Sequence, residues 1–202
     1  MKYKHIIFPS ILFATVALVS CENKEGLAKK VDGTWQSVPE DIVDTDSIRV
    51  SLIKSMEFAP AEEANGTLVV SAMLSVEKYM PQTDSIVSPL TVSAAAVASV
   101  TGKYEAISYD KIVLEPDQLT FSFAVDSAAV SYDYDVLTQN ATPESINLTP
   151  QVVAELNRYL TPIVKANLVK RDTLTNVKLS DLRMQCRSGN EELTLRLQTP
   201  QQ

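Results

Sequence analysis

Residues 68–76 read LVVSAMLSV, and every second residue of this run, from the first to the last, is apolar. Successive side chains of an extended strand point to opposite faces, so these apolar residues share one face. Three other runs alternate in the same way, at residues 92–100, 119–125 and 130–136. Each run has one apolar face and one that water can wet, as expected of an antiparallel sheet.

Turn residues separate these runs, and shorter apolar stretches add to the strand count. Combinations of Gly, Pro, Asn and Asp predict turns at residues 65–66, 101–103, 115–117 and 188–190. Further strands are predicted at residues 110–114, 177–184 and 192–198. A total of about eight to ten short strands at this spacing is typical of a β-sandwich or a β-barrel.

One segment departs from the strand pattern and predicts an α-helix near residues 150–168. Apolar residues recur there at helical spacing, and Thr149 and Pro150 suit the cap and the first position of a helix. Pro162 lacks an amide donor and clashes with the preceding turn, so we expect it to kink or end the helix. We expect the helix to cover an edge or one end of the sheet.

The first 21 residues predict a secretion signal. Lys2 and Lys4 give it a positive start, and an apolar core follows at residues 6–19. A membrane-spanning helix needs about 20 apolar residues, so this shorter core suits a signal that is removed. The segment ends in Leu18-Val19-Ser20-Cys21, which resembles the lipobox of bacterial, Bacteroidota-type lipoproteins. The alternative is an ordinary signal peptide with an incidental cysteine.

The lipobox resemblance implies a processing scheme and a location. In that family the cysteine is acylated and the chain is cut before it, so residues 1–20 are expected to be a signal peptide and Cys21 the lipidated residue. Residues 21–30 then form a lipidated tether, and residues 31–199 form one folded β domain. The implied location is the outer membrane, on its periplasmic or cell-surface side. The membrane is then a partner through the lipid on Cys21.

The composition excludes several classes of chemistry. The chain has one histidine, His5, and two cysteines, Cys21 and Cys186. Removal of the signal therefore leaves no histidine for a Ser-His-Asp or Cys-His mechanism or for a His-ligated zinc site. We expect no catalysis, no metal and no cofactor. The formal net charge of −7 also argues against a nucleic-acid partner, because phosphate contacts need clustered Lys and Arg.

A short motif opens the folded part of the chain. Gly33-Thr34-Trp35 resembles the Gly-x-Trp signature of lipocalins and of the wider calycin group. The resemblance implies an up-and-down antiparallel barrel in which Gly33 allows close backbone approach and Trp35 plugs the closed end. It also implies that an arginine of the last strand, here Arg196, packs over the tryptophan ring as a cation–π contact. The alternative is a β-sandwich in which the motif is incidental.

Aromatic residues of the middle strands are the candidate ligand contacts. If the barrel is open, its cavity is expected to be lined by Tyr104, Tyr132 and Tyr134. Two groups of carboxylates suit exposed segments better than a calcium site or a glycosidase site: Asp41, Asp44 and Asp46, and the pair Asp133 and Asp135.

Together these features predict a lipid-anchored envelope protein that binds rather than catalyses. The expected ligand is a small apolar molecule, a glycan fragment or a partner protein. The alternative is a non-catalytic structural or interaction subunit of an outer-membrane complex. An apolar-lined cavity of a few hundred Å³ favours the first function, and a filled core with an exposed apolar patch favours the second.

Overall fold

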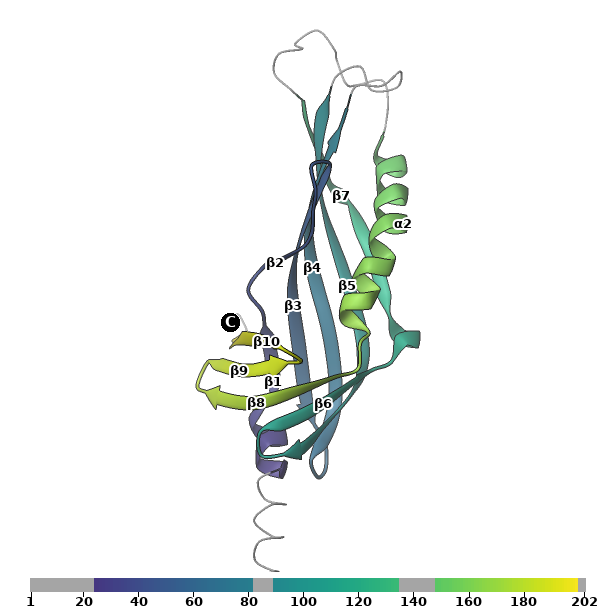
Figure 1. Ribbon diagram of the computed structural model, residues 1–202. Coiled ribbons are helices and arrows are strands. Elements are labelled where there is room, and N and C mark those ends of the chain that lie inside the picture. The colour runs from purple at the N-terminus through teal and green to yellow at the C-terminus, as the bar shows by residue number, and fades with distance from the viewer. Residues whose placement is uncertain (1–23, 82–88, 135–147, 200–202) are drawn as a thin grey trace, which may run out of the picture.

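The structure, a computed structural model, describes residues 24–81, 89–134 and 148–199 (Figure 1). Ten strands of this part of the chain form one antiparallel sheet, so the fold is mainly β as predicted. The elements are β1 (Gly33–Gln36), β2 (Glu40–Asp44), β3 (Ile48–Pro60), β4 (Asn65–Met80), β5 (Leu90–Ser108), β6 (Lys111–Pro116), η1 (Gln118–Thr120), β7 (Ser122–Tyr134), α2 (Thr149–Leu168), β8 (Asp172–Ser180), β9 (Arg183–Ser188) and β10 (Glu191–Leu197). A short helix at residues 24–30 precedes them.

Eight of the described strands close into a barrel. The sheet runs in the order β1-β10-β9-β8-β6-β5-β4-β3, and β1 pairs a second time with β3, which completes the ring. The two remaining strands lie outside the ring, β2 on β3 and β7 on β5. One sheet that closes on itself confirms the lipocalin-like barrel and excludes the sandwich, which needs two stacked sheets.

Strand β5 belongs to two parts of the molecule. Its first half, up to Ser99, pairs with β7, and its second half, from Gly102 on, pairs with β6 in the barrel. A Cβ on Gly102 would lie 2.3 Å from the Glu115 carbonyl oxygen and 2.7 Å from the Pro116 Cα, so a side chain is excluded there. The predicted turn at residues 101–103 is therefore wrong: this glycine permits close strand approach inside β5.

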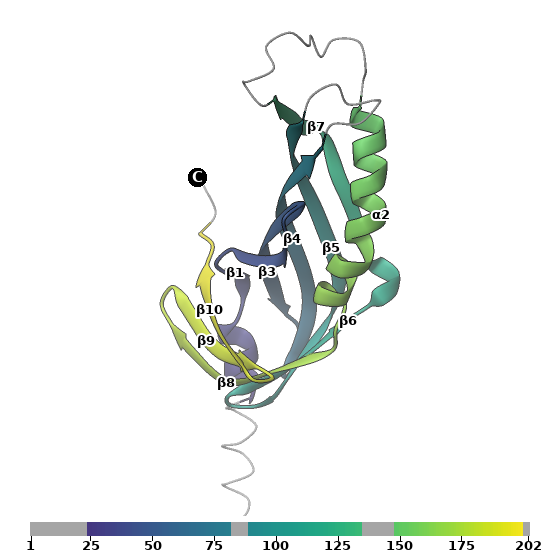
Figure 2. The ribbon, with the colours of Figure 1, turned by 45° about the horizontal axis from the view of Figure 1, so that its top comes forward.

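Helix α2 covers the sheet beyond the barrel (Figure 2). It contacts β7 and β5, and its buried face consists of Val152, Leu156, Leu160, Val164 and Leu168. The buried face of β5 opposite β7 is rich in alanine, at residues 94, 96 and 98. This alanine-rich run is unusual for a barrel wall, and the structure places it in the half of β5 that pairs with β7 rather than with β6.

The helix near residues 150–168 is confirmed, but two of its details differ from expectation. Leu148, not Thr149, occupies the cap position, and the Thr149 hydroxyl lies 2.9 Å from the Tyr132 hydroxyl instead. Pro162 does not end the helix. It removes the amide that would bond the carbonyl of Arg158 four residues earlier, and both residues are exposed, so water can satisfy that carbonyl.

The runs at 119–125 and 130–136 were expected to be alternating strand segments. Leu119 instead lies in the 3-10 helix η1 and is 88% exposed, whereas one strand, β7, spans both runs up to Tyr134. A bulge interrupts β7 between Asp126 and Ser131: these two residues are five positions apart on β7, but they pair with Ala95 and Ser93, which are two positions apart on β5.

Within the described residues, no helix is long and apolar enough to span a membrane.

Candidate binding site at the mouth of the barrel

The lower end of the barrel is closed by the helix at residues 24–30 (Figure 1). Leu27, Ala28 and Val31 are buried there. The Tyr104 hydroxyl donates a hydrogen bond of 3.1 Å to the Ala28 carbonyl, and the Trp35 indole donates one of 2.8 Å to the Val31 carbonyl. Residues 24–30 are thus part of the folded unit, which corrects the expectation that they belong to a tether.

Aromatic packing completes this closed end. The rings of Phe58 and Tyr104 meet edge to face, with centroids 5.0 Å apart and an interplanar angle of 83°. Trp35 is 3% exposed, in line with the expected role of plugging the closed end. The Tyr104 hydroxyl and the Trp35 indole N–H are both used in bonds to the backbone, so neither donor is free for a ligand at this end.

The opposite end of the barrel holds a cavity of about 320 Å³, next to the last turn of α2. Its volume lies within the usual range for small-molecule sites. The apolar part of its lining consists of Met56, Val70, Leu114, Leu168, Leu174 and Leu193. The polar part consists of Lys54, Asn167, Lys170, Asp172, Ser188 and Glu191.

The polar lining combines fixed and unpaired groups. The Asp172 carboxylate accepts hydrogen bonds from the Ser188 hydroxyl and, at 2.7 Å, from the Thr173 amide. Among the described residues, neither Lys54 nor Lys170 forms an ion pair within 4 Å. These ammonium groups are therefore free to contact a ligand whose apolar part rests on the buried side chains below.

Neither Tyr104 nor Tyr132 lines this cavity. Tyr104 lies at the closed end, where burial and, to a smaller extent, the charge of Asp32 raise its pKa to about 12. Tyr132 is half-buried between β7 and α2, and the side chain of Tyr134 lies outside the described residues. The expectation that tyrosines form the site is therefore wrong for Tyr104 and Tyr132.

Sequence reasoning missed Lys54, although a signal for it exists. Residues 48, 50, 52, 56 and 58 are apolar and point into the protein, and residue 54 shares their parity. A lysine at an inward position of an otherwise apolar strand face marks a place where the interior is open.

The signature residues are arranged differently from the expectation drawn from lipocalins. Gly33 has a φ of 107°, and a Cβ on it would lie 3.0 Å from the Leu197 side chain. Trp35 pairs with Leu197 and points inward, whereas Arg196 pairs with Gln36 and is exposed on the outer face. Arg196 therefore does not pack over the tryptophan.

A cation–π contact does occur elsewhere in the described residues. The Lys165 ammonium lies 5.8 Å from the centroid of the Phe121 ring, which joins α2 to the start of β7. This contact supports the packing of α2 and lies outside the cavity lining.

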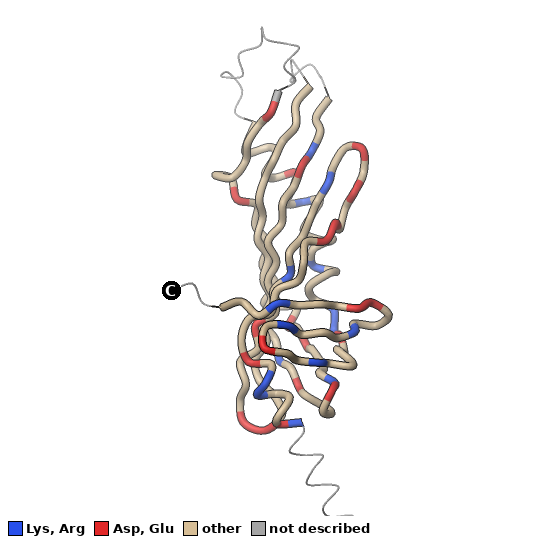
Figure 3. Tube along the Cα trace, turned by 90° about the vertical axis from the view of Figure 1, so that its left-hand side faces the viewer, with Lys and Arg blue, Asp and Glu red and all other residues tan. Residues whose placement is uncertain are grey.

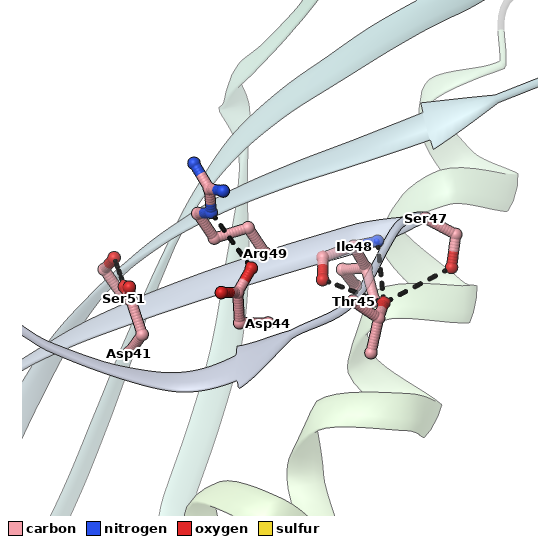
Figure 4. A network of polar contacts seen from close by, with 7 residues as sticks. All are labelled: Asp41, Asp44, Thr45, Ser47, Ile48, Arg49 and Ser51. Atoms are coloured by element: carbon pink, nitrogen blue, oxygen red, sulfur yellow. Dashed lines mark hydrogen bonds and ion pairs between the residues drawn. The ribbon is translucent and has the colours of Figure 1, made fainter.

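The acidic residues after Trp35 stabilise the β2–β3 hairpin (Figure 4). Asp41 accepts a hydrogen bond from the Ser51 hydroxyl, and Asp44 forms an exposed ion pair of 3.2 Å with Arg49. No group of three metal-ligating side chains occurs in the part of the chain that the structure describes. Asp133 is exposed on β7, and its proposed companion Asp135 lies outside the described residues.

Cys186 is the free thiol of the described residues, and it lies inside the barrel with 4% exposure. Burial, and to a smaller extent the charge of Asp172, raise its pKa from 9.0 to about 11. The buried thiol is thus held in its neutral, unreactive form at ordinary pH.

This shift predicts a loss of stability at alkaline pH. A pKa that is higher in the folded than in the unfolded state stabilises the fold below pH 9, and that contribution disappears as the pH rises towards 11. We expect the free energy of unfolding of the wild type to fall across this range more steeply than that of Cys186→Ala. Urea unfolding at a series of pH values measures the difference, and parallel curves would contradict the assignment.

No family model matches the chain, and the curated proteins contain no match to its sequence. Its function is therefore argued from the barrel and its cavity.

Proposed function

We propose that the protein is a lipid-anchored component of the cell envelope whose lipocalin-like barrel binds a small ligand at its open mouth. The observation that carries the binding role is the cavity of about 320 Å³ between the barrel interior and the end of α2. At the closed end of the barrel the donors of Tyr104 and Trp35 are engaged by the backbone carbonyls of Ala28 and Val31.

The lining of the cavity indicates the chemistry of the ligand. Buried side chains such as Met56 and Leu174 offer an apolar floor, while Lys54 and Lys170 offer unpaired cations. This combination suits a small apolar molecule that carries a polar group, or a glycan fragment that uses the polar part of the lining. Lipid anchoring through Cys21 and an outer-membrane location are proposed from the lipobox resemblance; Cys21 lies outside the described residues.

Filling the cavity is expected to weaken binding without disturbing the core. Ala166 lies on the cavity lining and is exposed, so Ala166→Trp places a ring in the mouth from the helix surface. Because a ligand site needs its concave volume, we expect the dye anilinonaphthalene sulfonate to bind about tenfold more weakly or not at all. Fluorescence titration measures the affinity, and native mass spectrometry shows whether a co-purified molecule is lost.

The matched control is Ala154→Trp, at an exposed position of α2 that does not line the cavity. It should bind the dye as the wild type does. Equal affinity in both tryptophan variants, with no molecule lost on substitution at residue 166, would contradict the cavity as the binding site.

A second function, that of an interaction subunit, is favoured by the outer face of the sheet. Met73 and Val97 are directly opposite each other on β4 and β5 and are 53% and 57% exposed. Ile53 of β3 and Ala124 of β7 continue this apolar row across four strands. If the two tryptophan variants bind alike and nothing co-purifies, this outer face becomes the better-supported functional surface.

A further inference from the structure

The charges of this acidic chain are distributed unevenly. Residues 170–197, which contain β8–β10, hold six Lys and Arg and four Asp and Glu, a net charge of +2. The other 12 of the 18 Lys and Arg and the other 21 of the 25 Asp and Glu lie elsewhere, so the rest of the chain carries −9. A protein whose charge is distributed this unevenly turns its positive side towards a negatively charged surface.

Four of these basic residues share the outer face of β8–β10 and are here called the basic wall: Lys178, Arg183, Arg187 and Arg196. All four are exposed, and they alternate along the strands with buried residues such as Met184 and Leu195. Arg183 lies directly opposite Arg196, and Lys178 lies opposite Gln185 of the same outer face. Figure 3 shows the basic positions along these hairpins.

The charge of the basic wall is partly offset by one neighbouring carboxylate, because Glu192 lies directly opposite Arg187 on the same outer face. Of its four side chains, none forms an ion pair within 4 Å in the described part of the chain. Like charges directly opposite each other on adjacent strands repel, so the facing Arg183 and Arg196 lower the stability of the isolated domain, which is a cost in free energy. An anionic surface outside the protein removes that cost. Lys178 and Arg187 line a hollow of this wall together with Gln185, Thr194 and Glu192.

The N-terminal segment limits how far the wall can lie from a membrane. Two residues separate Cys21 from Lys24, where the helix that closes the barrel begins. Whatever their conformation, three residue steps span at most about 10 Å. A lipid on Cys21 therefore holds the barrel within roughly one Debye length of the headgroups, where surface charge is felt.

The basic wall lies at the end of the molecule where this helix lies. In Figures 1 and 2, β8–β10 are beside the helix at residues 24–30, whereas the β2–β3 turn and most of α2 extend towards the other end. The acidic residues Asp41 and Asp44 of the β2–β3 hairpin are thus kept away from the anchored end.

We infer that the basic wall of Lys178, Arg183, Arg187 and Arg196 lies against the anionic headgroups of the membrane to which the protein is attached. The inference rests on the proposed lipid anchor for its proximity argument. The acidic β2–β3 hairpin extends away from this surface, which favours the orientation in which the basic wall faces the membrane (Figure 1).

The test uses the chain from Glu22 on, which lacks the lipidated residue but contains every described helix and strand. We expect it to sediment with vesicles of phosphatidylcholine and phosphatidylglycerol at low salt, and not with vesicles of phosphatidylcholine alone. High salt should release it, because exposed charges are screened. Circular dichroism and thermal unfolding verify the fold of each variant.

The double variant Arg183→Gln, Arg196→Gln carries the decisive comparison. Each basic residue near an anionic surface raises the partition coefficient about fivefold, so the loss of two should lower it about 25-fold. The change also removes two facing like charges, so folding is not expected to suffer. The matched control is Arg49→Gln, Arg158→Gln, which neutralises exposed residues on the β2–β3 hairpin and on α2, elements that extend away from the anchored end (Figure 1).

The control should retain its partition coefficient within about a factor of two, because its charges lie on elements that extend away from the anchored end, where the surface charge is screened. Equal losses in both double variants, absence of vesicle binding, or binding only to an acidic protein would overturn the inference. Salt-sensitive, wall-dependent binding in a protein whose Cys21 takes up no fatty acid would instead refute the anchor and leave the basic wall supported.

Discussion

Replacement of Cys21 by serine is expected to abolish the incorporation of labelled fatty acid completely. The lipobox resemblance assigns the acyl group to this thiol, and a serine hydroxyl is a far poorer nucleophile than a thiolate. Without the modification the chain should also keep its signal, so the protein should migrate as a longer species. Each buried CH₂ of an acyl chain contributes about 0.8 kcal/mol to membrane attachment, so the anchor itself should be lost.

Metabolic labelling followed by electrophoresis of membrane and soluble fractions measures this result. The matched control is Cys186→Ala, which removes the other cysteine, a buried one, and should leave labelling unchanged. Normal labelling of the Cys21→Ser protein would refute lipidation and, with it, the proposed attachment to the outer membrane. The binding role of the barrel does not depend on the outcome.

The local pattern of the sequence predicted the strands and the long helix well. Apolar residues alternate with other residues over 68–76 and 92–100, and this alternation indicates that one face of each strand is buried. The signal lies within the sequence of the strand itself. Apolar residues at helical spacing likewise located α2 to within one residue of its start. Closure of the ring by the pairing of β1 with both β10 and β3 is a long-range property, which alternation within one strand does not contain.

The misplaced site residues have identifiable physical reasons. Leu195 and Leu197 define the inward face of β10, so the parity of Arg196 already indicated the outer face. Tyr104 and Lys54 both occupy inward positions, and which end of the barrel each faces follows from strand register rather than from residue type.

The short helix at residues 24–30 was not predictable. Leu27 and Ala28 are the buried apolar residues of this helix, too few to show a helical pattern in the sequence. An isolated helix of this length is also unstable in water. Its stability comes from contacts with the barrel, which include the burial of Leu27 and Ala28, the hydrogen bond from Tyr104 to Ala28 and that from Trp35 to Val31, directly after the helix. A short polar sequence directly after a predicted lipidated cysteine is typical of a tether, so the sequence alone does not indicate this helix.

Removal of the Trp35 ring is expected to produce the largest loss of stability. Trp35→Ala deletes a nearly buried aromatic side chain, for which the usual cost is about 3–5 kcal/mol in the free energy of unfolding. Trp35→Phe keeps most of the packing but leaves the buried Val31 carbonyl without its donor, at a cost of about 1–3 kcal/mol. Urea unfolding should thus rank the wild type above Trp35→Phe and Trp35→Ala last.

The combination with Tyr104→Phe shows whether the short helix acts as one unit with the barrel. Tyr104 and Trp35 donate to Ala28 and Val31 at the end of the same helix, so either substitution alone leaves the other bond to hold it. When both donors are lost the helix should detach, and the double-mutant cycle should show a coupling of about 0.5–3 kcal/mol. Additive effects would mean that the two bonds act independently and that the short helix is not held as one unit.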